Sequence, residues 1–289
     1  MRRFLLVMAL LAPSVLRAAG PTESYSRNVA EWVDVARPAP DSLAGLIWFY
    51  AANHSRCEWR VYREGEAIGA VAETRPTRSP DAKPTFPTRH DPLGNGSLFC
   101  QVTDGWIVAY NQGEFGAALR WFSTDGKSER SISAHQVNQF LRQGDRIFAV
   151  EGLAHLTMST GSLIELKESG GRWTVVTLAE CPEAPEAFAE TGDESFVIAF
   201  SGSFGIYEKG KGLRILAKDM WGGPNPTSLV VSADKQIAYV GMRQYVVEID
   251  LGTGRARYLV PSKAFLNKLP AVEVEGLRRQ FDDMKRSAP

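Results

Sequence analysis

Short apolar runs recur along the chain, each following a turn that contains glycine or aspartate. The turn residues Asp104, Asp145, Asp193 and Asp234 are spaced 41, 48 and 41 residues apart. A second set of glycine-containing turns keeps a similar spacing: Gly126, Gly171, Gly212 and Gly254. A fixed period of this length indicates a repeated unit of supersecondary structure.

Each repeat divides into four short segments rich in β-branched and aromatic residues, which predicts four strands per unit. The last unit is predicted as strands over 228–232, 237–242, 245–251 and 255–261, and three earlier units between 98 and 218 follow the same plan. The first unit is predicted as strands over 29–35, 46–51, 57–63 and 67–73.

The second strand of each unit is apolar almost throughout, as in Leu46-Ile47-Trp48-Phe49-Tyr50, so both of its faces need cover. Units of about 40–45 residues with four strands each are typical of propeller blades. The sequence therefore predicts an all-β fold over 24–261, a small β-propeller of about five four-stranded blades, with six as the alternative.

The final unit, SLVVSADKQIAYVGMRQYVVEIDLGTGRARYLV, resembles a blade of the broad WD40, YVTN and quinoprotein-like β-propeller group. The resemblance extends over 97–261 and, more loosely, over 29–73. It implies a fold. The Trp-Asp dipeptide and the tryptophan docking motif of quinone-cofactor propellers are missing from this chain, so the resemblance implies no activity and no cofactor.

Two segments depart from the repeat. Residues 74–95 contain five prolines and are predicted to form an inserted, irregular surface loop. In the C-terminal extension 262–289, apolar residues recur at helical spacing, which predicts an amphipathic helix: Val274, Leu277, Phe281 and Met284. This helix is expected either to pack on the propeller or to dock a partner.

Residues 1–20 have the layout of a cleavable secretory signal. Arg2 and Arg3 are followed by the apolar run 4–12 and by the small residues Ala18, Ala19 and Gly20. The run is too short for a stop-transfer helix, and no later segment is apolar and long enough to predict stable membrane insertion. We therefore expect a periplasmic or secreted protein.

Charge narrows the range of partners. The chain has 33 basic and 33 acidic residues, and removal of the signal leaves a slight acidic excess. Binding of nucleic acid needs a concentrated basic footprint, which this composition does not favour. The remaining partner classes are protein, peptide and glycan.

The three cysteines, Cys57, Cys100 and Cys181, fall in a chain expected to be exported, where disulfides persist. The repeat register places Cys57 and Cys100 in adjacent units, so these two are the predicted disulfide; three buried thiols are the alternative. No cofactor or metal motif is found, and no catalytic or metal-binding residue is assigned.

Loops that join one blade to the next are predicted to gather at one mouth of the channel, where propellers commonly bind ligands. They carry the candidate ligand-binding residues His90, His135, Glu183, Trp221 and Asn225. The prediction is an exported, non-catalytic binding or scaffold propeller. The alternative is a channel-face enzyme, either a metal-dependent, lactonase-like hydrolase that uses such His and Glu side chains or a carbohydrate lyase.

Overall fold

The computed structural model describes residues 24–287 except 56, 74–77 and 157. Most of the chain folds into four antiparallel sheets that follow one another in sequence order. The first two comprise β6 (Leu98–Val102), β7 (Gly105–Asn111), β8 (Ala117–Ser123) and β9 (Glu129–Ser133), and then β10 (Val137–Gln143), β11 (Arg146–His155), β12 (Met158–Ser169) and β13 (Arg172–Cys181).

The other two large sheets comprise β14 (Pro185–Gly192), β15 (Ser195–Phe200), β16 (Phe204–Glu208) and β17 (Gly212–Ala217), and then β18 (Ser228–Val231), β19 (Ile237–Gly241), β20 (Val246–Asp250) and β21 (Ala256–Val260) with β1 (Val33–Asp34) added at its edge. Two hairpins complete the strands: β2 (Trp59–Glu64) with β3 (Ala67–Ala72), and β4 (Arg89–His90) with β5 (Gly94–Asn95).

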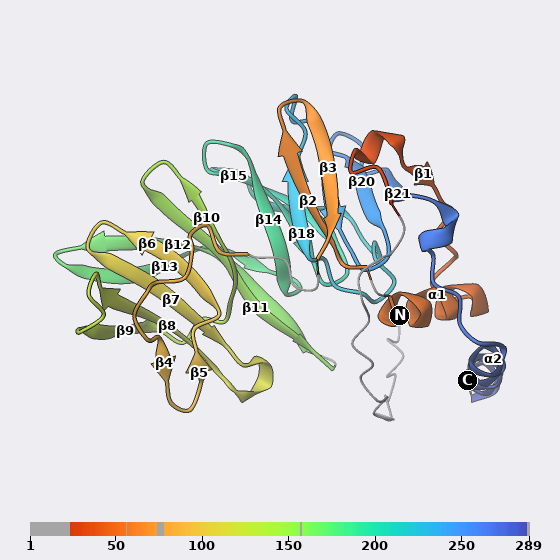
Figure 1. Ribbon diagram of the computed structural model, residues 1–289, viewed down its shortest axis with the longest axis horizontal. Coiled ribbons are helices and arrows are strands. Elements are labelled where there is room, and N and C mark those ends of the chain that lie inside the picture. The colour runs from red at the N-terminus through yellow and green to blue at the C-terminus, as the bar shows by residue number, and fades with distance from the viewer. Residues whose placement is uncertain (1–23, 56, 74–77, 157, 288–289) are drawn as a thin grey trace.

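The large sheets stand side by side along an arc, with β6–β9 at one end and the helices at the other (Figure 1). Successive residues of β11 point to opposite faces, as in any strand. Ile147 and Ala149 pack into a core shared with β6–β9, whereas Phe148 and Val150 pack into a core shared with β14–β17. Each middle sheet is thus covered on both faces by its neighbours, which explains the fully apolar second strands and confirms the propeller-like, all-β fold.

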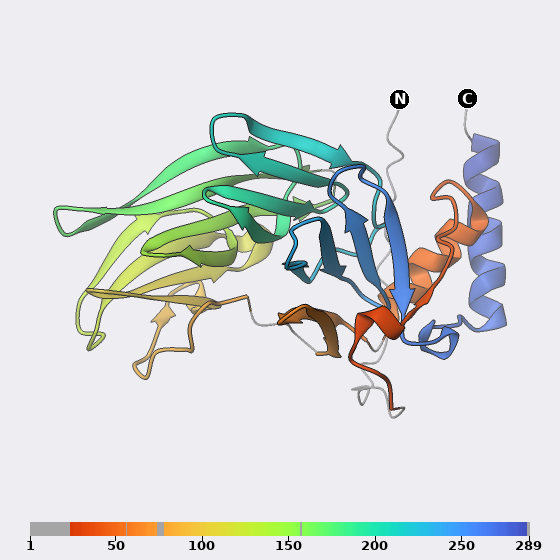
Figure 2. The ribbon, with the colours of Figure 1, turned by 90° about the horizontal axis from the view of Figure 1, so that it is seen from above.

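The hairpin β2–β3 continues this series beside β18. The Trp59 amide donates to the Met242 carbonyl (3.0 Å), and the Ser228 hydroxyl accepts from the Val61 amide (3.0 Å). Figure 2 shows the hairpin, in orange, between the β18–β21 sheet and the β6–β9 sheet. The first repeat is therefore present as a short sheet.

The predicted strand over 46–51 is wrong, because this segment lies in helix α1 (Leu43–Asn53). Ser42 precedes the helix and its side chain accepts from the Gly45 amide (3.0 Å), as an N-cap does. A long apolar run fits a buried strand or a helix equally well by periodicity, and here the cap and the length of the run favoured a helix. The predicted strand over 29–35 is also mostly absent: the turn of 3-10 helix η1 (Val29–Glu31) comes first, and only β1 pairs with a sheet.

The Pro-rich segment is irregular apart from β4 and β5, and parts of it pack against the large sheets. Arg78 accepts from the Phe140 amide through its carbonyl (3.4 Å), and the Ser79 hydroxyl accepts from the Phe99 amide (2.9 Å). Further along, Phe86 and Leu93 pack against the outer face of the first large sheet, in a core with Phe99, Val108, Tyr110 and Phe122. The segment therefore covers a sheet face that no other large sheet covers.

The predicted C-terminal helix is present as α2 (Ala271–Ser287), next to α1 at the edge of the molecule (Figure 2). Leu277 is its one buried residue, and the turn of 3-10 helix η3 (Lys263–Phe265) connects it to β21. No helix among the described residues has both the length and the apolar character needed to cross a membrane.

The three cysteines are buried free thiols, so the predicted Cys57–Cys100 disulfide is wrong. Cys57 belongs to the core around Trp59 and Val246, whereas Cys100 belongs to the core between the first two large sheets. Burial raises the pKa of Cys57 to about 11 and that of Cys100 and Cys181 to about 12, which keeps the thiols protonated. The predicted signal, residues 1–20, lies outside the described residues.

Candidate functional site

Two of the predicted mouth elements meet in space. The Asn225 side-chain amide donates to the Glu186 carboxylate (3.0 Å), and an Arg78 guanidinium nitrogen lies 3.7 Å from the other carboxylate oxygen. Arg78 also donates to the backbone carbonyls of Glu186 (2.9 Å) and Pro226 (3.0 Å). Burial raises the pKa of Glu186, and the Arg78 charge opposes that shift. Arg78 thus ties the Pro-rich segment to the starts of two sheets.

The other predicted polar residues are engaged locally. Glu183 accepts from the Gly202 amide (2.8 Å) and the Ser203 hydroxyl (3.3 Å), which holds the β15–β16 turn. His135 places Nδ1 2.8 Å from the hydroxyl of Ser133 on its own loop. His90 lies in β4 with its ring 5.6 Å from the ring of Tyr110. Among the described residues, no hydrogen bond or ion pair joins any two of His90, His135 and Glu183.

Trp221, one of the candidate ligand-binding residues, is fully buried. Its indole N–H donates to the Phe200 carbonyl (2.7 Å), and its own carbonyl accepts from the Tyr245 hydroxyl (2.8 Å). An indole with both faces in the core and its donor satisfied cannot stack on a ligand. Trp221 instead holds the junction between the β14–β17 and β18–β21 sheets.

A chain of side-chain amides at the same end of the sheets escaped the sequence analysis. Gln136 donates to Asn111 (2.8 Å), Asn111 donates to Asn138 (2.9 Å), and Asn138 donates to the Pro185 carbonyl (3.0 Å). Asn111 ends β7, and Gln136 and Asn138 lie at the start of β10. Polar side chains commonly hydrogen-bond to backbone groups at strand ends, so these residue types alone did not point to a site. Within the described part of the chain, no three His, Cys, Asp or Glu side chains gather as metal ligands would.

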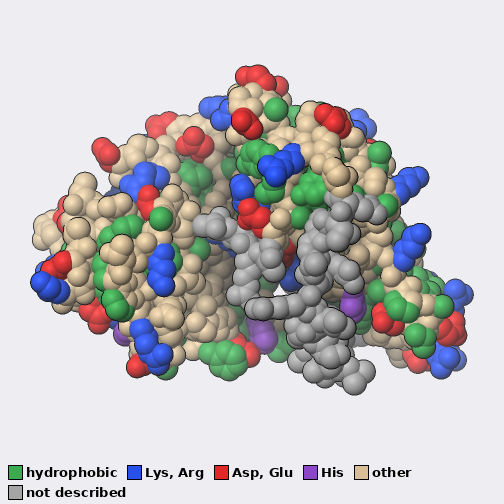
Figure 3. All heavy atoms as spheres, in the orientation of Figure 1, with side chains coloured by type: hydrophobic (Ala, Val, Ile, Leu, Met, Phe, Trp, Pro, Cys, Tyr) green, Lys and Arg blue, Asp and Glu red, His purple; other side chains and the backbone are tan. Residues whose placement is uncertain are grey.

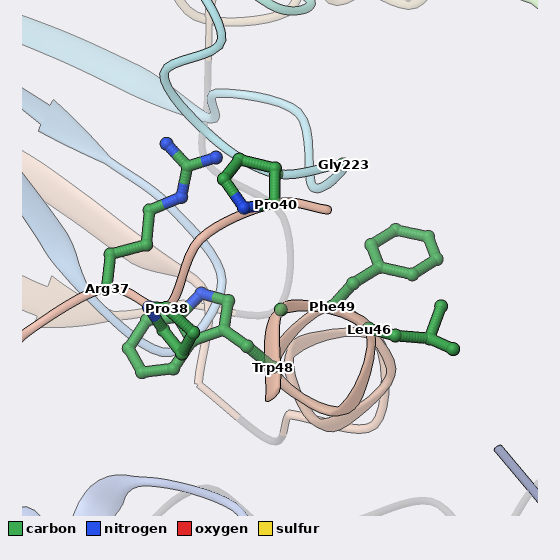
Figure 4. A pocket seen from close by; sticks show the side chains of 9 residues that line it. Arg37, Pro38, Pro40, Leu46, Trp48, Phe49 and Gly223 are labelled. Carbon is green, nitrogen blue, oxygen red and sulfur yellow. The ribbon is translucent and has the colours of Figure 1, made fainter. Parts of the chain in front are cut away.

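A concave site lies elsewhere, between α1 and the loop that follows Trp221. It has a volume of about 280 Å³ and its walls are mainly apolar (Figure 4). The lining residues are Arg37, Pro38, Pro40, Gly45, Leu46, Trp48, Phe49, Gly222 and Gly223. We call this the α1 pocket.

Arg37 supplies the one charged group of the α1 pocket. Its Nη1 donates to the carbonyls of Asp219 (2.5 Å) and Met220 (2.7 Å) and to the Tyr258 hydroxyl (3.2 Å), and these three contacts fix the guanidinium. Its Nη2 is buried and has no hydrogen-bond partner among the described residues. A buried donor without a partner is costly and uncommon, so this nitrogen needs an explanation.

Trp48 gives the pocket a second donor of the same kind. Its ring is tilted against that of Tyr245 (5.4 Å between centroids), and its buried indole N–H lies beside the Tyr245 hydroxyl without forming a hydrogen bond of normal geometry. Two donors that share this property line one small cavity.

The loop at 222–223 has the backbone that such a pocket requires. Gly222 and Gly223 have φ values of +68° and +119°, in a region that L-residues with side chains rarely adopt. A Cβ at Gly223 would lie 2.2 Å from the Phe49 ring, and one at Gly222 would lie 3.2 Å from Arg37 Nη2. The two glycines therefore let the loop close over α1 without filling the cavity.

The α1 pocket was missed because its main wall was predicted as a strand inside a blade. The segment Asp41-Ser42 followed by an apolar run of ten or so residues was the available signal for a capped helix. Ligand pockets are lined mainly by hydrophobic and aromatic side chains, which this helix supplies.

Comparison with known proteins places the chain in no established family: no family model matches, and no curated protein matches. Among solved structures, a gluconolactonase from Xanthomonas campestris is similar with a TM-score of 0.40 and 8% identity, covering 60% of this chain and 61% of the other. The extracellular domain of a proposed one-component system from B. thetaiotaomicron has a TM-score of 0.42 and 10% identity, over 80% of this chain and 29% of that one.

PorZ, a surface component of the type-IX secretion system of Porphyromonas gingivalis, has a TM-score of 0.40 and 7% identity over 68% of this chain and 30% of its own. The chain thus spans less than two thirds of each of these proteins. Similarities this low assign neither an activity nor a ligand to the chain.

Proposed function

We propose that this chain is an exported, non-catalytic binding protein whose α1 pocket holds a small carboxylate with an apolar body. The observation that carries the proposal is the pair of buried donors at the wall of the pocket: Arg37 Nη2 has no partner among the described residues, and Trp48 Nε1 makes no hydrogen bond of normal geometry. A ligand acceptor would satisfy donors that the described residues leave unsatisfied.

The chemistry of the lining favours a carboxylate. Arg37 and Trp48 are the only lining residues with polar side chains, and both can only donate. A guanidinium forms its strongest hydrogen bonds with carboxylates or phosphates. The rest of the wall is proline, leucine and aromatic surface, which favours an apolar group attached to a single charge.

Export rests on the signal layout of residues 1–20. The surface is compatible with this assignment, since basic and acidic side chains are interspersed over the face in Figure 3. We also infer that the fold is a five-bladed propeller in which β2–β3 is a shortened blade, supported by its backbone pairing with the 241–243 turn beside β18.

Titration with phenylacetate, followed by calorimetry, tests the ligand class. We expect binding in the micromolar to millimolar range, and at least tenfold weaker binding of phenylacetamide, which has the same shape without the charge. Trp48→Phe keeps the aromatic wall and removes one donor, so it should weaken binding of the acid about tenfold. Trp173→Phe, in a distant part of the fold, is the matched control and should leave binding unchanged.

Equal affinity for the acid and the amide would overturn the carboxylate assignment. If neither compound binds and Trp48→Phe has no effect on any acid tested, the α1 pocket is a packing defect between α1 and the 222–223 loop.

A further inference from the structure

A second concave site lies on the outer side of the first two large sheets, far along the chain from α1. It is a groove of about 430 Å³ between the edge strand β9 and the β12–β13 turn. Its lining residues are Trp121, Arg130, Ser131, Ile132, Gly171, Arg172 and Trp173. Two tryptophans and two arginines from different sheets thus share one groove, which we call the Trp/Arg groove.

The two tryptophans are positioned by the same turn. Trp173 donates its indole N–H to the Asp104 carboxylate (3.2 Å). The indole nitrogen of Trp121 lies near Gly105, where an added Cβ would be only 3.1 Å from it. This nitrogen is buried and has no hydrogen-bond partner among the described residues. The groove therefore offers aromatic rings that are held in fixed positions.

The two arginines supply positive charge that the protein does not neutralise. Arg130 lies over the Trp121 ring (5.2 Å from Cζ to the centroid) and donates to the Gly171 carbonyl (2.9 Å), so its guanidinium is held in place across the two sheets. No ion pair with a described residue involves Arg130 or Arg172. Two carboxylates beside the groove accept from neutral donors and pair with neither arginine: Asp104 accepts from Trp173, and Glu168 accepts from the Gly171 amide (2.6 Å).

We propose that the Trp/Arg groove binds an acidic oligosaccharide, with a uronate carboxylate on the two guanidinium groups and a sugar ring against Trp173. Aromatic side chains offer a broad apolar face with a polar edge, which suits a sugar ring that has both C–H and hydroxyl groups. Planar guanidinium groups bind carboxylates in a bidentate manner.

The groove does not suit nucleic acid. Two guanidinium groups make a local charge of limited extent, and the chain as a whole has equal numbers of basic and acidic residues. Nucleic-acid affinity depends on neutralising many successive phosphates. A short acidic glycan needs only the charge that the groove provides.

The test uses the full chain after residue 20 with trigalacturonate as the probe, measured by calorimetry at low salt. Three comparison compounds separate the sources of binding: the methyl ester of the same trisaccharide, a neutral galactose trisaccharide and sodium sulfate. We expect trigalacturonate to bind at least tenfold more tightly than each of them, and we expect its affinity to fall as salt is added.

Variants locate the site. Arg172→Gln changes an exposed side chain and should weaken binding at least tenfold without affecting folding; Trp173→Ala should weaken it by a similar factor through loss of the ring contact. Arg214→Gln, an exposed arginine on β17, is the matched control and should bind as the parent does. Phenylacetate binding in the α1 pocket should be unchanged in all three variants, so this proposal and the proposed function can fail separately.

Three outcomes would overturn the proposal. Equal binding of the methyl ester would show that carboxylates are not recognised, and equal binding of sulfate would reduce the groove to a simple anion site. Unchanged trigalacturonate affinity in both Arg172→Gln and Trp173→Ala would place the glycan elsewhere.

Discussion

The sheets in the middle of the arc and those at its two ends have their apolar faces covered in different ways. In the β10–β13 and β14–β17 sheets, both faces are covered by neighbouring sheets of the same kind. Phenylalanine rings pack between these two sheets, and the ring centroids of Phe148 and Phe196 are 4.8 Å apart. At the ends, the cover is irregular. The Pro-rich segment covers the first large sheet with Phe86 and Leu93, and the β2–β3 hairpin covers the last. A repeat predicts its own packing only where the partner is another copy of the repeat.

The largest effect should come from the regular part. Phe196 is fully buried between two sheets and contacts the rings of Phe148, Phe188 and Tyr207. Phe196→Ala should lower the free energy of unfolding by about 3–5 kcal/mol, because it removes apolar burial and leaves a cavity. Phe86→Ala, in the irregular cover, should cost about 1–2 kcal/mol, because Phe86 is only partly buried. Urea unfolding of both variants measures the difference; equal losses would show that the ends are packed as tightly as the middle.

The same division explains how far the sequence could be interpreted. In the regular four-stranded sheets, the predicted strands over 228–232 and 237–242 match β18 and β19 within a residue, because alternating faces and turn residues both act locally. At the ends, identical apolar composition had a different outcome: the run from Leu46 to Tyr50 became a helix because Ser42 caps it and no neighbouring strand pairs with it. The hydrophobic periodicity of a segment does not indicate whether a neighbouring strand is available to pair with it.

The candidate sites were harder to predict for a related reason. Of the residues expected at the channel mouth, Asn225 meets Glu186, while Trp221 is buried and the histidines remain apart. Arg37, Trp48 and Arg78 were missed, since each acts through a contact with a residue far away in sequence, such as Arg78 with Glu186. Loop position along the chain predicts an end of the fold but not which side chains face one another.

Substitution of Arg78 tests whether the Pro-rich segment contributes to the stability of the sheets that it contacts. Arg78→Ala should lower the free energy of unfolding by about 2–3 kcal/mol, because Glu186 keeps a largely buried charge with its cation removed. The double variant Arg78→Met with Glu186→Gln should recover much of this loss, since no uncompensated charge remains.

The pH dependence of Arg78→Ala gives a second measurement. Burial raises the folded-state pKa of Glu186 above its ordinary value of 4.5, so the unpaired carboxylate is a cost where it is ionised. That cost disappears as the pH falls and the group becomes protonated in both states. The variant should therefore approach the parent in stability between pH 7 and about 4.5. A constant gap over this range would contradict the role assigned to the Glu186 charge.

A smaller effect is expected from the ion pairs around Glu194, in the regular part. Arg146 and Lys209 both pair with Glu194, and their hydrogen bonds lower its pKa from 4.5 to about 2. A carboxylate with a lowered pKa stabilises the fold above its unfolded pKa, and this contribution is lost as the pH falls from about 4.5 to 2. Glu194→Gln should remove that part of the acid sensitivity at a cost of about 1 kcal/mol near neutral pH, because solvent screens the exposed Lys209. Acid unfolding of the variant and of Glu66→Gln, an exposed control, makes the comparison; matching acid profiles would show that Glu194 contributes nothing.

The smallest change in the free energy of unfolding should come from Trp48→Phe. A small change is expected if Trp48 serves ligand binding in the α1 pocket rather than the stability of the fold. In the free protein the buried indole N–H makes no hydrogen bond of normal geometry, so its removal relieves a cost of the same order as the packing that the smaller ring loses. We expect the free energy of unfolding to change by less than about 0.5 kcal/mol, measured by urea unfolding without ligand, while carboxylate binding falls. A loss of 2 kcal/mol or more would mean that Trp48 already has a good partner inside the protein. The α1 helix would then be one more irregular cover for a sheet, and the end of the arc would differ from its middle in packing alone.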